Sequence, residues 1–521
     1  MPRNFQDTAT LASAMACASA AVLARLWGAL AREPIAGVRA RRIDGGTLTC
    51  TLADGRRLAG PAALAEPFTQ ASAAELTLDG IGYADPAELL RALDLPGESD
   101  RLAEELAGSV ANLALARAVR PEPDGGPPLL SRLATSPDPL AVLEQSIVDG
   151  HPVHPCCRTR TGMSTMDQLR YAPEHRPVVP LALVPIPADR LFVTGDWPDW
   201  LRDGENLLLP VHPWQHARYG LAPAHASLPA HPLMSLRTLS LVDRPWHVKT
   251  AVDVQMTSAV RTVSPAAVRN GPAVSALLDE LARRVPGWRP VPEVAAAAVL
   301  VGGEPSRHLA AALRRAPRLP TGRLAMPFAA LSAPSPATGR ALVTELTQAP
   351  AELLGDIVAV TLPPLLRLLD LGVALEAHGQ NTLLVLDRGQ PSGLLYRDLG
   401  GVRVSQARLR AHGIPAPPLH GDIPTDDPQV LRTKLFAAVL GVLGELVATL
   451  AREYGEPPEK LWDAVAARIR YFAPALAPGA RRLCYSMFTG RWPIKAMIVM
   501  RLATDPLQDV WAELANPLEG R

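Results

Sequence analysis

The chain has 521 residues, of which 48% are hydrophobic, and it carries 52 Lys or Arg against 51 Asp or Glu, for a formal net charge of +1. At roughly 100–200 residues per domain, a chain of this length predicts two to four domains or one large multi-lobed body, with a core that needs no disulfide or metal. The balanced charge excludes a broad basic surface for nucleic acid or acidic membranes, so any anion site must be a local cluster.

Cysteine usage and the N-terminal segment predict a cytoplasmic protein. The five cysteines show no framework spacing, which fits a reducing compartment. The uncharged, Ala-rich stretch from Leu11 to Ala24 weakly resembles a signal peptide, but apolar residues recur at helical spacing up to Leu30. We therefore expect one amphipathic helix. No unbroken apolar run reaches the ~18–20 residues needed to span a membrane, so no membrane contact is predicted.

The first 140 residues predict a small β meander followed by helices. Three short strands are expected at Val38–Ile43, Thr47–Leu52 and Arg56–Ala59. Asp-Gly turns between them are strong hairpin signals. Residues 62–118 then favour helices, one opened by Pro86 and another from Arg101 to Val119. No residue of this region predicts chemistry.

The middle of the chain, up to about residue 333, predicts mixed helix and strand, with one clear hairpin. Its first strand is expected from Leu236 to Val242 and its second from Trp246 to Met256. Because side chains alternate along a strand, Lys249 and Asp253 should share one face, opposite Val248.

The last third predicts a helical region from Ala351 to Leu371, interrupted at Pro363-Pro364. A short apolar strand should follow at Gly372–Leu375, and two more at Thr382–Leu386 and Leu394–Tyr396. Helices should dominate from Gln429 onward, including a helix-like segment over Ile494–Leu502.

A proline-rich loop, Gly-His-Pro-Val-His-Pro at 150–155, is the first candidate site. Its prolines fix the backbone around His151 and His154, with Arg158 and Arg160 close behind, which suits an anion. Two alternatives stay open. One is a zinc site that adds Cys156 and Cys157, although no second ligand pair has zinc-type spacing. The other is a loop whose histidines only cap local backbone.

The predicted hairpin collects hydroxyl and cationic side chains, and it is the second candidate site. The residues are Ser235, Arg237, Thr238, Lys249, Thr257, Ser258, Arg261 and Thr262. Arg forks, a Lys point charge and hydroxyl donors together suit a triphosphate. The alternative is a solvated strand face with ordinary charges.

Polar residues between apolar strands form the third candidate site. Glu376, His378, Gln380 and Asn381 follow the first strand, and Arg397 and Asp398 follow the hairpin. Such residues are costly to bury without a role, and a loop Asn with a later Asp resembles the Mg²⁺ ligands of phosphate-transfer enzymes. A polar turn is the alternative. Lys495 and Arg501 lie six residues apart, so they do not share one helical stripe.

Together these segments resemble the IucA/IucC family, the NRPS-independent siderophore synthetases. The matching motifs, in the family's order, are G-H-P-V-H-P with R-x-G-M-S behind it, S-L-R-T, K-x7-T-S-x-x-R-T, G-V-A-L-E-A-H-G-Q-N, R-D-L-G-G-V-R and K-A-M-I-V-M-R-L. They span residues 150–502. One position departs from the family, which commonly has Lys where Arg158 stands, and this puts the role of Arg158 in doubt.

The resemblance implies an α+β fold shaped like a cupped hand and usually a homodimer. The implied parts are a helical and β-meander thumb (1–139), fingers with an antiparallel sheet (140–333), and a mostly helical palm with a small kinase-like sheet (334–521). ATP and Mg²⁺ would bind between fingers and palm. The implied nucleotide-binding residues are His154, Ser235, Arg237, Thr238, Lys249, Arg261, Glu376, Asn381 and Asp398, with Glu376 and Asp398 serving the metal.

The resemblance also implies a reaction. A carboxylate, citrate or a citryl or succinyl derivative, would be adenylated and then condensed with an amine or hydroxyl, releasing AMP and pyrophosphate. Arg261, His378 and Lys249 would be catalytic, and Arg261, His378 and Lys495 would contact the acid. Two other functions remain open: a phosphotransferase that uses the palm alone and releases ADP, and a metal-binding module.

Overall fold

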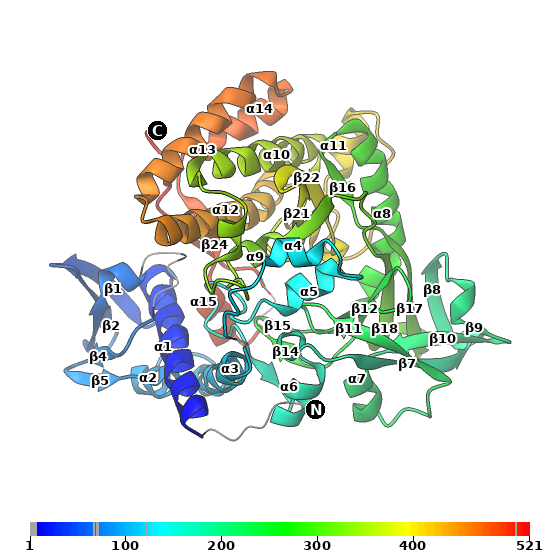
Figure 1. Ribbon diagram of the computed structural model, residues 1–521, viewed down its shortest axis with the longest axis horizontal. Coiled ribbons are helices and arrows are strands. Elements are labelled where there is room, and N and C mark those ends of the chain that lie inside the picture. Colours follow the sequence, from blue (N-terminus) through cyan, green and yellow to red (C-terminus); the bar gives the residue numbers. More distant parts are fainter. Residues whose placement is uncertain (1–7, 66–67, 69–71, 121, 506–507) are drawn as a thin grey trace.

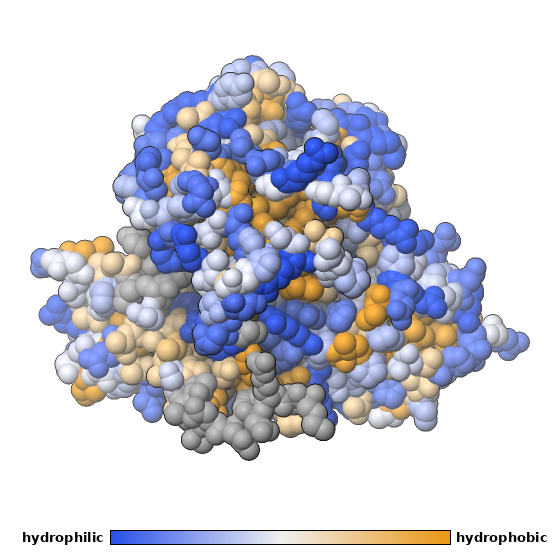
Figure 2. All heavy atoms as spheres, in the orientation of Figure 1, coloured by the Kyte–Doolittle hydropathy of each residue, from blue (hydrophilic) through white to orange (hydrophobic). Residues whose placement is uncertain are grey.

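A computed structural model describes residues 8–65, 68, 72–120, 122–505 and 508–521. It mixes helices and sheets in three parts that are visible in Figure 1: an N-terminal helix–sheet unit, a large antiparallel sheet, and a C-terminal helical part with small sheets. Figure 2 shows one face of the molecule, which is largely covered by hydrophilic residues.

The N-terminal unit packs helices against a five-stranded antiparallel sheet. Helix α1 (Thr8–Arg32) confirms the predicted amphipathic helix, and α2 (Pro86–Leu93) and α3 (Ser99–Ala118) match the two predicted later ones. The strands are β1 (Val38–Asp44), β2 (Thr47–Leu52), β3 (Arg57–Pro61), β4 (Leu76–Leu78) and β5 (Ile81–Tyr83). The helical prediction for 62–118 was wrong at β4 and β5. These strands are only three residues long, too short to show a period of two.

Two helices of the described residues, Leu11–Arg32 within α1 and α12 (Pro428–Tyr454), are long and apolar enough to cross a bilayer. The sequence has no unbroken apolar run of that length because a few charged residues interrupt both helices. In the fold, 61% and 67% of their apolar windows are buried against the rest of the protein. Burial on this scale is typical of core helices, which are hydrophobic on most sides.

The large sheet has nine strands in the order β8-β17-β18-β13-β12-β11-β7-β10-β9. Their bounds are β7 (Val179–Pro187), β8 (Leu191–Gly195), β9 (Arg202–Asp203), β10 (Asn206–Val211), β11 (Ala226–Pro232), β12 (Thr238–Leu241), β13 (Trp246–Thr250), β17 (Glu293–Val301) and β18 (Glu304–Arg315). Neighbouring strands run antiparallel, and α8 (Pro265–Arg284) packs on β17. The sheet brings the β12–β13 hairpin to its centre.

The predicted hairpin exists, but its second strand ends at Thr250 rather than at Met256. The amide of Val252 donates to the carbonyl of Arg261 instead of to a sheet neighbour, so the chain turns away. It then forms β14 (Gln255–Met256), which pairs with β15 (Ala259–Val260) and β6 (Arg160–Thr161). The predicted alternation of faces therefore stops at Thr250.

The C-terminal part surrounds a four-stranded sheet in the order β16-β22-β21-β19. The strands are β16 (Trp288–Pro290), β19 (Arg323–Pro327), β21 (Thr382–Asp387) and β22 (Gln390–Tyr396). The β21–β22 hairpin was predicted. Because β16 and β19 precede residue 334, this sheet spans the predicted boundary between fingers and palm, and the three-part division stays a prediction.

Three predicted details of the C-terminal part were wrong. Helix α10 (Pro350–Leu371) continues through Pro363 and Pro364, since its buried face packs into the main core despite a typical cost of about 3 kcal/mol per interior proline. Strand β20 covers only Val373–Ala374. Lys495 lies on strand β24 (Trp492–Lys495), where buried and half-buried residues alternate, and α15 begins only at Met497 and ends at Leu502.

The remaining elements connect these parts. They include α4 (Leu129–Leu133), α5 (Pro139–Gln145), α6 (Thr165–Tyr171), α7 (Pro213–Arg218), α9 (Phe328–Leu331), β23 (Arg403–Val404), α11 (Gln406–Ala411), α13 (Pro458–Phe472), α14 (Pro478–Tyr485) and β25 (Trp511–Leu514). Helices α10, α12 and α13 bury their apolar residues in one large core.

Candidate functional site

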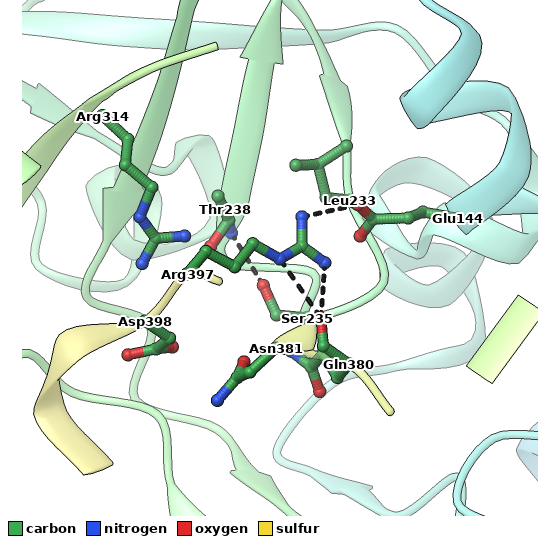
Figure 3. A pocket seen from close by; sticks show the side chains of 9 residues that line it. All are labelled: Glu144, Leu233, Ser235, Thr238, Arg314, Gln380, Asn381, Arg397 and Asp398. Atoms are coloured by element: carbon green, nitrogen blue, oxygen red, sulfur yellow. Dashed lines mark hydrogen bonds and ion pairs between the residues drawn. The ribbon is translucent and has the colours of Figure 1, made fainter. Parts of the chain in front are cut away.

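A small polar pocket lies between the centre of the nine-stranded sheet and the loops at the ends of β20 and β22 (Figure 3). Its lining residues are Glu144, Leu233, Ser235, Thr238, Arg314, Gln380, Asn381, Arg397 and Asp398. Four of the residues predicted to bind nucleotide, Ser235, Thr238, Asn381 and Asp398, thus meet in one place.

Strand register explains why this side of the pocket is cationic. Thr238 on β12 lies opposite Lys249 on β13, and the next row on the same face joins His247 to Arg314 on β18. Arg314 is also paired with Glu293 on β17, 2.7 Å away. Sequence reasoning missed Arg314, because only long-range strand pairing brings it beside Lys249.

An ion pair connects the sheet to the C-terminal part. The Lys249 ammonium lies 2.6 Å from Oδ1 of Asp398. Burial would raise the pKa of Asp398, but Lys249, Arg314 and Arg237 hold it far below its usual range, so Asp398 is a carboxylate at neutral pH. Its left-handed backbone (φ 70°) is tolerated by Asp better than by most residues, and such conformations are frequent at functional sites.

A second buried ion pair supports the same loops. The Arg397 guanidinium donates to Glu144 at 2.6 Å and to the Gln380 carbonyl at 3.0 and 3.2 Å. The other oxygen of Glu144 accepts the Met234 amide at 3.0 Å, directly before Ser235. Arg397 and Glu144 therefore fix the loops of Ser235 and Gln380 relative to each other, as the dashed lines in Figure 3 show in part.

Arg237 and Arg261 donate hydrogen bonds to neighbouring loop residues. Arg237 donates to the Thr262 carbonyl at 2.6 Å, and Arg261 donates to Thr257 Oγ1 at 2.6 Å. Burial lowers the pKa of Arg237 to about 10 and also lowers that of Arg261, so both remain charged at neutral pH. Leu236 (φ 64°) and Thr257 (φ 52°) have left-handed backbones, which are strained for bulky or β-branched residues. These loops are held in costly conformations next to the cations.

The histidines of the predicted site are neutral hydrogen-bond donors. Nδ1 of His154 accepts the Cys156 amide at 3.0 Å, so Nε2 carries the proton and faces Ser258 Oγ, also at 3.0 Å. Nδ1 of His378 accepts the Gln380 amide at 3.3 Å, which leaves its Nε2 as the donor. Burial lowers the pKa of both rings.

Charges from two parts of the site influence the pKa of His378. Burial, the largest influence, lowers it; Glu376 and Asp398 raise it, and Lys495 and Lys434 lower it. His378 is therefore influenced both by Asp398 at the pocket and by the charges around Glu376.

Glu376 belongs to a group of four charged side chains, of which the sequence analysis singled out only Glu376 and Lys495. Its Oε1 lies 2.8 Å from the Lys434 ammonium on α12 and 3.4 Å from that of Lys495. Asp509, just before β25, lies 3.0 Å from Lys495 and 3.8 Å from Lys434. We call these four residues the four-charge cluster. Lys434 and Asp509 are separated from the family motifs along the chain, so spacing could not reveal them.

Arg158, Arg160 and Arg501 do not join the site. Arg158 and Arg160 both pair with the buried carboxylate of Glu174, and Arg158 also donates to the carbonyls of Ile147 and Val148. Arg501 pairs with buried Glu105. These arginines hold loops and helices together, so the contacts of Arg158 indicate a structural role.

Among the described residues, the structure offers no ligand set for the zinc site considered above. Cys156 and Cys157 are both buried, and burial raises the pKa of Cys156 well above its usual range. Over the described ranges of the chain, no group of three or more His, Cys, Asp or Glu is arranged to hold a metal ion.

Two family models match parts of the chain. The IucA / IucC family model matches residues 139–333, and the model described as ferric iron reductase FhuF-like transporter matches residues 352–507. Staphyloferrin A synthase of Staphylococcus aureus (strain NCTC 8325 / PS 47) is 26% identical over 429 residues, 73% of each chain. D-ornithine--citrate ligase of the same organism is 26% identical over 37% of this chain and 35% of its own length.

Solved structures share the fold. The petrobactin biosynthesis protein AsbB from Bacillus anthracis superposes with a TM-score of 0.79 at 20% identity, over 98% of both chains. ATP-bound aerobactin synthetase IucA from Klebsiella pneumoniae gives a TM-score of 0.73 at 19% identity, over 96% of this chain and 100% of that one. Residues 139–333 therefore match the IucA / IucC family model, and the chain as a whole shares the fold of the AsbB and IucA structures.

Proposed function

We propose that the protein is an ATP-dependent siderophore synthetase that adenylates a carboxylate and condenses it with an amine or hydroxyl. The observation that carries this proposal is the contact between Lys249 and Asp398 (2.6 Å), where a cationic sheet face meets a carboxylate-bearing loop. The names of the relatives, a staphyloferrin synthase and a citrate ligase, support the same class of reaction.

The nucleotide phosphates would bind at the centre of the large sheet. Lys249, Arg237 and Arg261 supply positive charge, and hydroxyls of Ser235 and Thr238 supply hydrogen bonds. His154 would donate its Nε2 proton from the neighbouring loop. Asn381 lines the opposite side of the pocket, where its amide can contact the nucleotide.

Mg²⁺ fits the two carboxylates assigned to it. Lysines contact Oδ1 of Asp398 and Oε1 of Glu376, and within the described part of the chain the second oxygen of each has no recorded hydrogen bond. Hard oxygen ligands of this kind are what Mg²⁺ prefers, usually together with phosphate oxygens. The ion would neutralise phosphate charge there.

The acid would lie between Arg261, His378 and Lys495. A carboxylate oxygen forms a bond to the α-phosphorus of ATP. The bond between that phosphorus and the oxygen that bridges it to the β-phosphorus breaks, and pyrophosphate leaves. An amine nitrogen or hydroxyl oxygen then bonds to the acyl carbon, AMP leaves with the former carboxylate oxygen, and the nucleophile loses its proton to solvent. The carboxylate must be activated in this way because an amine or hydroxyl that attacked it directly would have to displace oxide, which is a poor leaving group.

The protein contributes alignment and charge stabilisation to these steps. Arg261 and Lys249 would offset charge that grows on phosphate and carboxylate together. His378 would donate a hydrogen bond to the carboxylate, because burial keeps its ring neutral and its Nδ1 is already an acceptor. Citrate or a citryl or succinyl derivative is the proposed acid, since several separate cations suit a polyanion.

The wider architecture is proposed on the same basis. The N-terminal unit would be the thumb, the nine-stranded sheet the fingers and the C-terminal helices the palm of a cupped hand. We also propose a cytoplasmic homodimer.

Product analysis tests the proposal. The purified protein is incubated with α-labelled ATP, Mg²⁺ and citrate, with hydroxylamine to trap activated acyl groups. We expect AMP, pyrophosphate and a hydroxamate. ADP as the sole nucleotide product would instead support the phosphotransferase alternative. A panel of carboxylic acids, followed by amines and alcohols with the best acid, would define the substrates.

A further inference from the structure

The four-charge cluster places an internal carboxylate beside the proposed acid site. Glu376 follows β20, Lys434 lies on α12 and Lys495 on β24, whereas Asp509 comes from the connection between α15 and β25. The two lysines and two carboxylates alternate, at 2.8 to 3.8 Å. The cluster is therefore electrically neutral as it stands.

Asp509 is the most exposed member of the cluster. Its side chain is 32% exposed, against 29% for Lys495, 20% for Glu376 and 8% for Lys434. Within the described ranges its hydrogen-bonding and ion-pair partners are the two lysines, whereas one oxygen of Glu376 contacts both of them. A partly exposed ion pair of this kind contributes little net free energy, so a competing anion can replace it.

One lysine of the cluster also belongs to the proposed acid site. Lys495, on β24, is one of the three residues that would contact the acid, and its ammonium lies 3.0 Å from Asp509 and 3.4 Å from Glu376. The nearer of its two partners is therefore Asp509, a carboxylate at the edge of the proposed site.

We propose that Asp509 is a specificity-determining residue that occupies Lys434 and Lys495 when no acid is bound, and that a carboxylate of the acid substrate displaces it. A monocarboxylate would exchange one ion pair for an equivalent one, so its net binding free energy would be small. A polycarboxylate would bind more tightly, because its other carboxylates can reach Arg261 and His378. This inference rests on the proposed acid site and adds to it Lys434 and the competing carboxylate.

Binding measurements on the full chain test this proposal. Citrate is titrated calorimetrically into the wild type, Asp509→Asn and Asp509→Glu, with and without α,β-methylene-ATP, which cannot release pyrophosphate. We expect Asp509→Asn to lower the Kd for citrate about three- to tenfold, as loss of a partly exposed ion pair allows. Asp509→Glu keeps the competitor and should remain near the wild type. The Kd for the nucleotide should not change in either variant.

Glu513→Gln is the matched control. Glu513 lies on β25 in the same hairpin, and its side chain is exposed and pairs with Arg491 instead of the cluster. An unchanged or raised Kd for citrate in Asp509→Asn, with an intact circular dichroism spectrum, would overturn the proposal. Equal tightening in Glu513→Gln would do so as well, since it would reveal only a general charge effect.

The same experiment separates this inference from the proposed function. If the wild type forms a hydroxamate from citrate but Asp509→Asn binds citrate no better, only the role of Asp509 is lost. If no carboxylate of the panel binds the wild type under either condition, both proposals fall together.

Discussion

The ammonium of Lys249 lies 2.6 Å from Oδ1 of Asp398, although 149 residues separate them in the chain. Lys249 comes from the central strand pair of the large sheet and Asp398 from the loop after β22. The Lys249 side chain is buried, that of Asp398 is 27% exposed, and Asp398 lines the pocket of Figure 3.

Replacing Lys249 with Ala should lower hydroxamate formation by about two to three orders of magnitude, the usual cost of losing one positioned charge at a reacting centre. The variant should also be less stable, because Asp398 loses its nearest partner in a buried position. Steady-state kinetics and thermal unfolding measure the two effects. Lys460→Ala, which breaks a surface pair with Glu456, is the control and should leave activity unchanged.

Arg261→Ala should abolish hydroxamate formation while leaving the fold intact. Arg261 donates to Thr257 and to the Met256 carbonyl, contacts that hold a short loop rather than a core. Circular dichroism checks the fold, and Arg269→Ala, at a surface pair with Glu304, is the matched control. Near-normal activity of Arg261→Ala would mean that the phosphates bind elsewhere.

Arg158 should matter for stability and not for chemistry. Its guanidinium meets Glu174 in a buried site, so Arg158→Ala should cost about 3–5 kcal/mol of unfolding free energy. Arg158→Lys, which restores the residue common in the family, should recover most of that loss. Urea unfolding gives the free energies. A large fall in kcat for a well-folded Arg158→Lys would contradict the structural role.

Glu33 should make stability depend on pH. Burial raises the pKa of Glu33 from 4.5 to about 7, even though the amides of Ile498 and Val499 donate to it. Between these values the folded state binds more protons than the unfolded state, so this contribution to stability is present at pH 4.5 and is lost as pH rises through 7.

Glu33→Gln keeps an acceptor for both amides but cannot ionise. Its unfolding free energy relative to the wild type should therefore increase between pH 5 and pH 8. Glu88→Gln, on the exposed side of α2, removes a surface carboxyl and is the control. A constant difference for Glu33→Gln would show that Glu33 does not titrate in this range.

Residue spacing and family resemblance predicted many local elements and four residues that line the candidate pocket. The hairpin, Ser235, Thr238, Asn381 and Asp398 could be singled out because the motifs that carry them are continuous in sequence. Arg314, Glu144, Lys434 and Asp509 were not found. Each of these reaches the site only through strand register or helix packing between distant segments, which spacing along the chain does not encode.

The errors in secondary structure have a similar origin. Met256 was assigned to the strand that ends at Thr250, because alternation of side chains continues in the sequence while the backbone partners change. The helix α10 was expected to break at Pro363, but tertiary packing outweighs the local cost. Lys495 was assigned to a helix, whereas pairing with Trp511 across the hairpin makes it part of a strand.

The four-stranded sheet takes β16 and β19 from before residue 334 and pairs them with β21 and β22 after it. Residues on the two sides of the boundary at 334 are thus joined by main-chain hydrogen bonds. Residues 140–333 and 334–521 cannot separate as two rigid bodies without breaking that sheet. For the same reason, fragments cut at the boundary would each expose unpaired strand edges and should be prone to aggregate.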